Sequence, residues 1–117
     1  SLLSFFSHYL IAKQLNDDAH DWQKDLKKGQ INSVAALILK RTRHDLDQIF
    51  WYEVVDDVCV LIAYHISQAR NSLKEMHFIK DIQFFEKLIQ RQESSIRLTL
   101  NEKKKALSFI NTYSMKV

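Results

Sequence analysis

The stretch "EVVDDVCVLIAYH", Glu53 to His65, is the densest apolar segment of the chain, and it contains three acidic residues near its start. Successive residues of an α-helix lie about 100° apart around its axis. On that spacing, the apolar residues of this region cover roughly 200° of arc, which is wider than the apolar stripe of an ordinary surface helix. We therefore expect a central helix with a narrow solvent-exposed edge. The side predicted to face the core comprises Trp51, Val54, Val55, Val58, Cys59, Leu61, Ile62, His65, Ile66 and Ala69.

The composition predicts an all-α protein. The 117 residues include one Gly and no Pro, whereas the tight turns of β-sheet and α/β proteins depend on both. Gly29 is placed to end the first helix in the left-handed conformation. Hydrophobic residues make up 46% of the chain and charged residues 26%, which suits one globular domain over residues 1–117. We predict a compact bundle of four to five mostly antiparallel helices with short loops.

Capping signals divide the chain into helices. Asn32 or Ser33 can cap a second helix. Asp45, with Gln48 three residues later, either starts a third helix or lies within an uninterrupted one. The spacing S-x-x-E at 72–75 predicts a further boundary, and T-x-x-E at 99–102 a weaker one. The expected helices are therefore 2–28, 33–43, 46–70, a fourth that Ser72 caps, and a short last helix that Thr99 caps. In the first of these we expect Leu3, Phe6, Leu10, Ala19, Trp22 and Leu26 to face inward, and in the fourth Met76, Phe78, Phe85, Leu88 and Ile89.

The acidic residues fall opposite the apolar side of the central helix. Glu53 and Asp57 lie on the polar side and Asp56 lies at its margin, so the direct interpretation is a solvated stripe. The segment is also similar to the second acidic motif of MazG-type nucleotide pyrophosphohydrolases, an E-x-x-D leading into an apolar helix. This resemblance covers about a dozen residues.

That resemblance implies a Mg²⁺ site on carboxylates from two helices, since the enzymes of this family are all-α. Their first motif is E-E-x-x-E, and its nearest match here is Asp17, Asp18 and Asp21, with the shorter Asp in place of each Glu. Hard cations such as Mg²⁺ prefer oxygen ligands and bridge phosphate oxygens. The enzyme hypothesis is therefore a Mg-dependent nucleotide pyrophosphohydrolase. Its metal ligands would be Glu53, Asp56, Asp57, Asp17 and Asp21.

A second resemblance concerns nucleic acid. Arg70 and His77 in "ARNSLKEMH" resemble the R-x4-6-H motif of HEPN ribonucleases, and the polar Asn71 follows the Arg as in that family. Those ribonucleases are all-α proteins that place Arg and His near an RNA phosphate. The alternative function is thus an RNA-binding or HEPN-like ribonuclease module. Basic residues at helix ends explain the clusters "KRTRH" and "KKK" without RNA, and a net charge of +3 is mild. The residues of this alternative would be Lys40, Arg41, Arg43, Arg70 and His77.

The remaining chemistry-bearing residues favour structural roles. No two of the five histidines have the i, i+4 spacing of a shared metal site. Asp17, His20 and Asp21 can share one helix face, where a surface cluster is the commoner outcome. His65 is expected as a hydrogen-bonded core residue. Cys59 is expected to be a small core residue in a reducing compartment, which predicts a cytoplasmic location. No apolar run is long enough to span a bilayer.

Adjacent aromatic residues favour a protein–protein interaction. Neighbouring residues on a helix point about 100° apart, so the members of such a group cannot all face one core. Some must pack against an additional helix, a partner chain or water, and a homodimer is the simplest arrangement. We therefore expect a non-catalytic interaction or regulatory domain that self-associates, with no cofactor and with nucleic acid disfavoured. The groups are Phe5, Phe6 and Tyr9; Phe50, Trp51 and Tyr52; and Phe84 and Phe85.

Overall fold

The computed structural model describes residues 1–41, 45–76 and 81–115, with the side chains of 113–115 left out. Within these residues the protein is 90% helical and has no strand, which confirms the predicted all-α bundle. The elements are α1 (Leu2–Lys27), α2 (Ser33–Leu39), α3 (Leu46–Ile49), the π-helical turn η1 (Phe50–Val54), α4 (Val55–Glu75) and α5 (Ile82–Met115).

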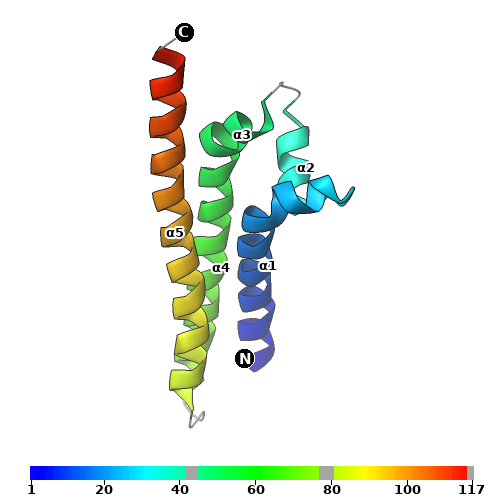
Figure 1. Ribbon diagram of the computed structural model, residues 1–117. Coiled ribbons are helices and arrows are strands. Elements are labelled where there is room, and N and C mark those ends of the chain that lie inside the picture. Colours follow the sequence, from blue (N-terminus) through cyan, green and yellow to red (C-terminus); the bar gives the residue numbers. More distant parts are fainter. Residues whose placement is uncertain (42–44, 77–80, 116–117) are drawn as a thin grey trace.

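Three long helices form the body of the molecule (Figure 1). α1 and α4 pack along each other in opposite directions, and α5 packs against both. α2 lies to one side of α1, and the chain then returns through α3 and η1 to the start of α4. α5 continues past the end of α1, so the molecule is elongated, with extents of 61 × 28 × 20 Å.

The local signals at three helix ends are confirmed. Gly29 has a φ of 81°, the left-handed conformation that glycine adopts without strain. The side chain of Asn32 accepts a 2.9 Å hydrogen bond from the Ala35 backbone N–H at the start of α2. That of Asp45 accepts a 3.2 Å bond from the Gln48 N–H at the start of α3. The side chains of Asn32 and Asp45 each satisfy a backbone donor that the helix itself leaves unpaired.

α3, η1 and α4 form one unbroken helical run. In η1 the Val55 N–H donates to the carbonyl of Phe50, five residues earlier, which defines the π-turn. The predicted start at Leu46 is confirmed, but the predicted end at Arg70 is wrong. The run continues to Glu75 because Ser72 is no cap: it is buried, and its hydroxyl lies 3.0 Å from that of Ser4 on α1.

Two other predicted boundaries are also wrong. No helix starts at Thr99, whose buried hydroxyl donates 3.0 Å back to the Ser95 carbonyl within a continuous α5. The hydroxyl therefore bonds to the preceding turn, whereas an N-cap oxygen accepts from an N–H two or three residues later. α2 ends at Leu39 rather than near Arg43, and Arg43 itself lies outside the described residues.

The core confirms most of the predicted inner face of α4. Seven of its members are buried, whereas Trp51 and His65 are half-buried. Leu61, at the edge of the apolar arc, is 45% exposed, so its placement in the core was wrong. The buried members are Val54, Val55, Val58, Cys59, Ile62, Ile66 and Ala69.

Near the N-terminus of α1, two of the residues predicted to face inward lie on the exposed side. Leu3 and Leu10 are 79% and 56% exposed, while Phe5 and Ala12 are buried. The buried stripe also contains Asn16, which is only 3% exposed. A polar residue in the middle of the stripe breaks the hydrophobic period, which made the neighbouring apolar stripe look like the inner face.

The later inward residues agree better with their prediction. Ala19, Trp22, Met76 and Ile89 are buried. Four others pack against the core while partly exposed: Phe6, Leu26, Phe85 and Leu88. Phe78 lies outside the described residues. Among the described helices, none combines the length and apolar character that crossing a bilayer requires.

Candidate functional site

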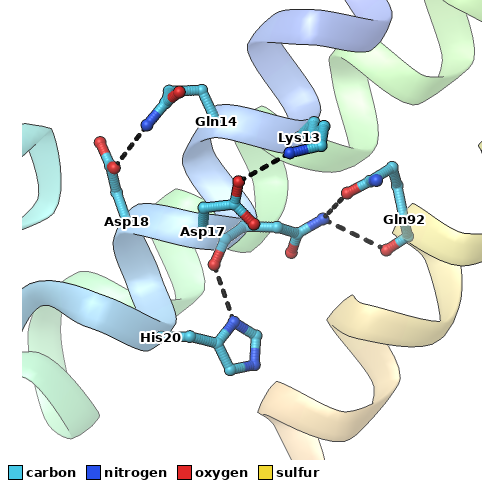
Figure 2. A network of polar contacts seen from close by, with 7 residues as sticks. Lys13, Gln14, Asp17, Asp18, His20 and Gln92 are labelled. Carbon is cyan, nitrogen blue, oxygen red and sulfur yellow. Dashed lines mark hydrogen bonds and ion pairs between the residues drawn. The ribbon is translucent and has the colours of Figure 1, made fainter.

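The acids predicted on α1 have local partners (Figure 2). The exposed Asp17 carboxylate forms a 3.0 Å ion pair with Lys13, one turn earlier. Asp18 is 7% exposed and accepts 2.8 Å from the Gln14 amide. It also accepts 3.2 Å from the Ser33 N–H and 2.5 Å from the Ser33 hydroxyl. Asp18 therefore ties the first turn of α2 to α1, a structural role that the sequence did not reveal.

The acids predicted on η1 and α4 turn toward different neighbours. Asp56 accepts 2.7 Å from Lys103 on α5, and Asp57 lies 3.7 Å from a guanidinium nitrogen of Arg41, just after α2. Glu53 is half-buried in η1. Across the described part of the chain, no three His, Cys, Asp or Glu side chains are grouped so as to hold a metal ion. The structure thus does not bring these acids together with Asp17 and Asp21 (both on α1) into the two-helix site of the enzyme hypothesis.

The residues of the nucleic-acid hypothesis are engaged or lie outside the described residues. Arg70 makes two 3.1 Å hydrogen bonds to Glu93 of α5 and a 3.5 Å ion pair with Glu86. The bond to Glu93 is the main cause that raises the Arg70 pKa above its usual value. Its guanidinium therefore clamps α4 to α5 rather than facing solvent as a phosphate ligand. His77 lies outside the described residues.

The basic cluster after α2 has a similar local explanation. Arg41 donates 2.9 Å to the carbonyl of Leu37, an orphan carbonyl at the C-terminal end of the helix. Lys40 is the exposed C-cap residue of α2. Cations at a helix C-terminus are favoured by the dipole. Helix termination therefore accounts for this part of the cluster.

A polar contact inside the bundle joins α1 to α5. The Asn16 side-chain amide donates 2.7 Å to the side-chain oxygen of Gln92, and both residues are buried. His20 lies beside it, and its Nδ1 is 2.7 Å from the Asn16 carbonyl (Figure 2). Its Nε2 is 3.5 Å from the Thr99 hydroxyl. The predicted cluster of His20 with Asp17 and Asp21 is therefore not assembled, because the imidazole turns toward α5.

A groove runs between the end of α1, α3 with η1, and the C-terminal half of α5. It has a volume of about 460 Å³ and adjoins a wider hollow of about 770 Å³ across Gln23. Gln23 donates a hydrogen bond to the Asp47 carboxylate where the two meet. We call this the terminal groove. Its lining is Gln23, Asp45, Asp47, Gln48, Trp51, Ala106, Phe109 and Ile110.

Two polar contacts join α5 to η1 and α4 beside the terminal groove. Tyr52 donates 2.8 Å to Asn111 of α5, and the Lys103–Asp56 ion pair adds a second connection one to two turns away. These contacts hold the C-terminal half of α5 against η1 and α4. Phe109 on that half is nevertheless 71% exposed.

The adjacent aromatic residues were the only sequence signal for this groove. In the group at 50–52, Phe50 is 2% exposed, Trp51 is half-buried and lines the groove, and Tyr52 is 48% exposed. This confirms the expectation that the three cannot share one core. The acidic wall formed by Asp45 and Asp47 was not predicted as part of a site, because both read as helix-start residues.

The described parts of the chain therefore offer as a candidate site a groove lined half by apolar and half by polar side chains, of which two are acidic. Three of the sequence-predicted metal ligands, Asp17, Asp56 and Asp57, form ion pairs. Comparisons with protein-family models, with curated proteins and with solved structures found no match, so the case for any function rests on this geometry.

Proposed function

We propose that this chain is a non-catalytic helical interaction domain that self-associates, with the terminal groove of each copy receiving α5 of the other. The observation that carries the proposal is Phe109, a large aromatic side chain 71% exposed at the edge of a groove that Trp51 and Ile110 also line. Burying such a ring is a strong driving force, because an aromatic side chain removes roughly 150–250 Å² from water.

The charges around the groove support a second copy as the occupant. One wall carries Asp45 and Asp47. On α5, Lys105 lies one helical turn before Phe109, so the two side chains share a face. In a two-fold symmetric dimer the same patch serves both partners, and a residue i that contacts j is matched by j contacting i. The patch thus contains its own complement: an aromatic ring for the groove and a cation for the acidic wall.

The arrangement that satisfies both contacts is antiparallel. The C-terminal halves of two α5 helices run in opposite directions, each Phe109 enters the partner's groove, and each Lys105 approaches the partner's Asp45 and Asp47. The elongated shape leaves room for this, since α5 extends beyond α1 (Figure 1). A stable interface buries about 800 Å² on each partner. Leu98, 59% exposed on the same helix, can extend the contact toward that size.

Sedimentation equilibrium over micromolar to submillimolar concentrations tests the proposal. We expect a monomer–dimer equilibrium that Phe109→Glu weakens by roughly thirty-fold or more, the equivalent of about 2 kcal/mol for an aromatic anchor. Leu3→Glu is the matched control: it changes an equally exposed apolar residue, 79% exposed, at the far end of α1. A native protein that stays monomeric throughout, or equal effects of the two variants, would refute self-association through this groove.

A charge-reversal series tests the orientation. Lys105→Glu should weaken the dimer, whereas Lys104→Glu makes the same charge change about 100° around the helix and should leave it nearly unchanged. Adding Asp47→Lys to Lys105→Glu should recover part of the loss, since both contacts are then reversed together. If Lys104→Glu has the larger effect, the proposed antiparallel register is wrong.

A further inference from the structure

Two histidines from different helices face each other in the α1–α4 interface. The Nδ1 atoms of His8 and His65 are 2.9 Å apart, and the ring centroids are 5.2 Å apart with planes tilted by 31°. The centroid separation exceeds the nitrogen separation by about one ring radius on each side, so both Nδ1 atoms lie close to the line between the rings. This is the geometry of an N–H···N hydrogen bond. A bridging metal ion would instead need both lone pairs to converge on a point off that line.

The contact requires a particular protonation state. A neutral imidazole has one nitrogen that donates and one that accepts. The bond therefore forms when both rings are neutral, or when one is an imidazolium and the other neutral. When both rings are protonated, each Nδ1 carries a hydrogen, no acceptor remains, and two positive charges meet at short distance. The second proton must break the contact.

The described surroundings of the two rings disfavour the second proton. Both rings are half-buried, and burial followed by the neighbouring His8 lowers the pKa of His65. Tyr64 lies edge-on to His8 and His65, with centroids 6.4 and 5.1 Å away. Among the described residues of α1, α4 and α5, Lys13 pairs with Asp17, Arg70 with Glu86 and Glu93, and Lys103 with Asp56.

We propose that His8 and His65 form a proton-operated clasp between α1 and α4, closed while at least one ring is neutral and open when both are protonated. The hydroxyl contact of Ser4 with Ser72, 3.0 Å long, lies further along the same interface and is the neighbouring polar link. Opening the clasp frees the N-terminal half of α1, which buries Phe5 against the core. This property is independent of self-association.

The sign of the pH effect follows from linkage. A histidine whose pKa is lowered in the folded state binds fewer protons there than in the unfolded chain. The stability that it contributes is complete above the ordinary histidine pKa of about 6.5 and is lost as the pH falls below that value. In the limit, the folding equilibrium constant drops about ten-fold for each unit by which the pKa of His65 is lowered.

Side-chain NMR titration of the full chain tests the clasp directly. In the native protein His65 should titrate below the usual histidine range. His8→Asn keeps an amide that can bond to the ring but cannot take up a proton, so the pKa of His65 should move back toward its usual value. His20→Asn, a change at a histidine bonded to a backbone carbonyl, should leave the His65 titration unchanged. A native His65 that titrates at or above the usual value overturns the proposal.

Amide hydrogen exchange distinguishes a clasp from a general loss of stability. After correction for the intrinsic pH dependence of exchange, amides of residues 2–15 should lose protection between about pH 7.5 and about pH 5.5, more than those of α5. His8→Asn should remove most of this difference. Equal loss of protection in α1 and α5 would contradict the clasp, and so would a difference between the two helices that His8→Asn leaves unchanged. If His8→Asn does not fold, the exchange pattern and the His65 titration of the native protein decide.

Discussion

Asp17 and Asp18 are neighbours of the same chemical type, and the structure predicts opposite consequences for their removal. Asp18 is 7% exposed and accepts three hydrogen bonds, two from Ser33 and one from Gln14. The Asp17 side chain is 49% exposed and has one ion pair, with Lys13. Asp18→Ala should therefore destabilise the fold substantially, and Asp17→Ala should hardly affect it.

The magnitude for Asp18→Ala follows from its partners. A hydrogen bond to a charged group contributes about 1.5–3 kcal/mol, and loss of a side chain that caps a helix start costs about 0.5–2 kcal/mol. Ser33 and Gln14 are both exposed, so their donors can turn to water, and the three bonds do not simply add. We expect a loss of about 2 kcal/mol, which lowers Tm by roughly 6–10 °C for a chain of this size.

The companion variants make the estimate sharper. Asp17→Ala should cost about 0.5 kcal/mol or less, the usual contribution of an exposed i, i+4 ion pair. Asp18→Asn keeps one acceptor oxygen and should cost about half as much as Asp18→Ala. Urea unfolding followed by circular dichroism at the helical band gives all three values. An Asp18→Ala variant within about 0.5 kcal/mol of the native protein, or an equal loss for Asp17→Ala, would refute this reasoning.

Three further predictions concern α4 and the metal hypothesis. Val58→Asp places an unpaired charge at a fully buried position, so it should cost several kcal/mol and abolish the unfolding transition. Asp57→Ala should cost under about 1 kcal/mol. If Asp57→Ala lowers the free energy of unfolding more than Val58→Asp, the orientation of α4 is wrong. Burial raises the pKa of the Cys59 thiol, so a thiol reagent at mildly alkaline pH should label the folded protein far more slowly than the protein in urea, and equal rates would contradict its burial. Millimolar Mg²⁺ or Mn²⁺ should leave Tm unchanged, because a ligand raises Tm only when it binds the native state. A rise of several degrees that Asp57→Asn removes would support the hydrolase hypothesis.

Features that depend on neighbouring residues could be predicted from the sequence. The near absence of Gly and Pro argues against the frequent tight turns of β and α/β proteins, and therefore predicts an all-α protein. Gly29, Asn32 and Asp45 act on backbone groups within a few residues of themselves, so their roles are set locally. The inner face of α4 was also predictable, because a wide uninterrupted apolar arc has few alternative orientations.

The candidate site was only partly predictable. Adjacent aromatic residues indicated that Trp51 and Tyr52 could not both enter the core. They did not indicate which elements would form the other walls of the terminal groove. The groove exists because α5 continues beyond α1, and a continuous α5 depends on Thr99 bonding within the helix instead of capping a new one. The same T-x-x-E spacing is compatible with either outcome.

Long-range partners decided what the sequence left open. The buried Asn16 amide bonds to Gln92, 76 residues later, and the buried Ser72 hydroxyl lies against that of Ser4, 68 residues earlier. His8 and His65 meet across 57 residues. The sequence by itself determined the helical class, three helix ends and the central apolar face, since these follow from local periodicity and capping. Only the tertiary structure decided which polar residues are buried, because burying a polar group costs less where another element supplies a hydrogen-bond partner.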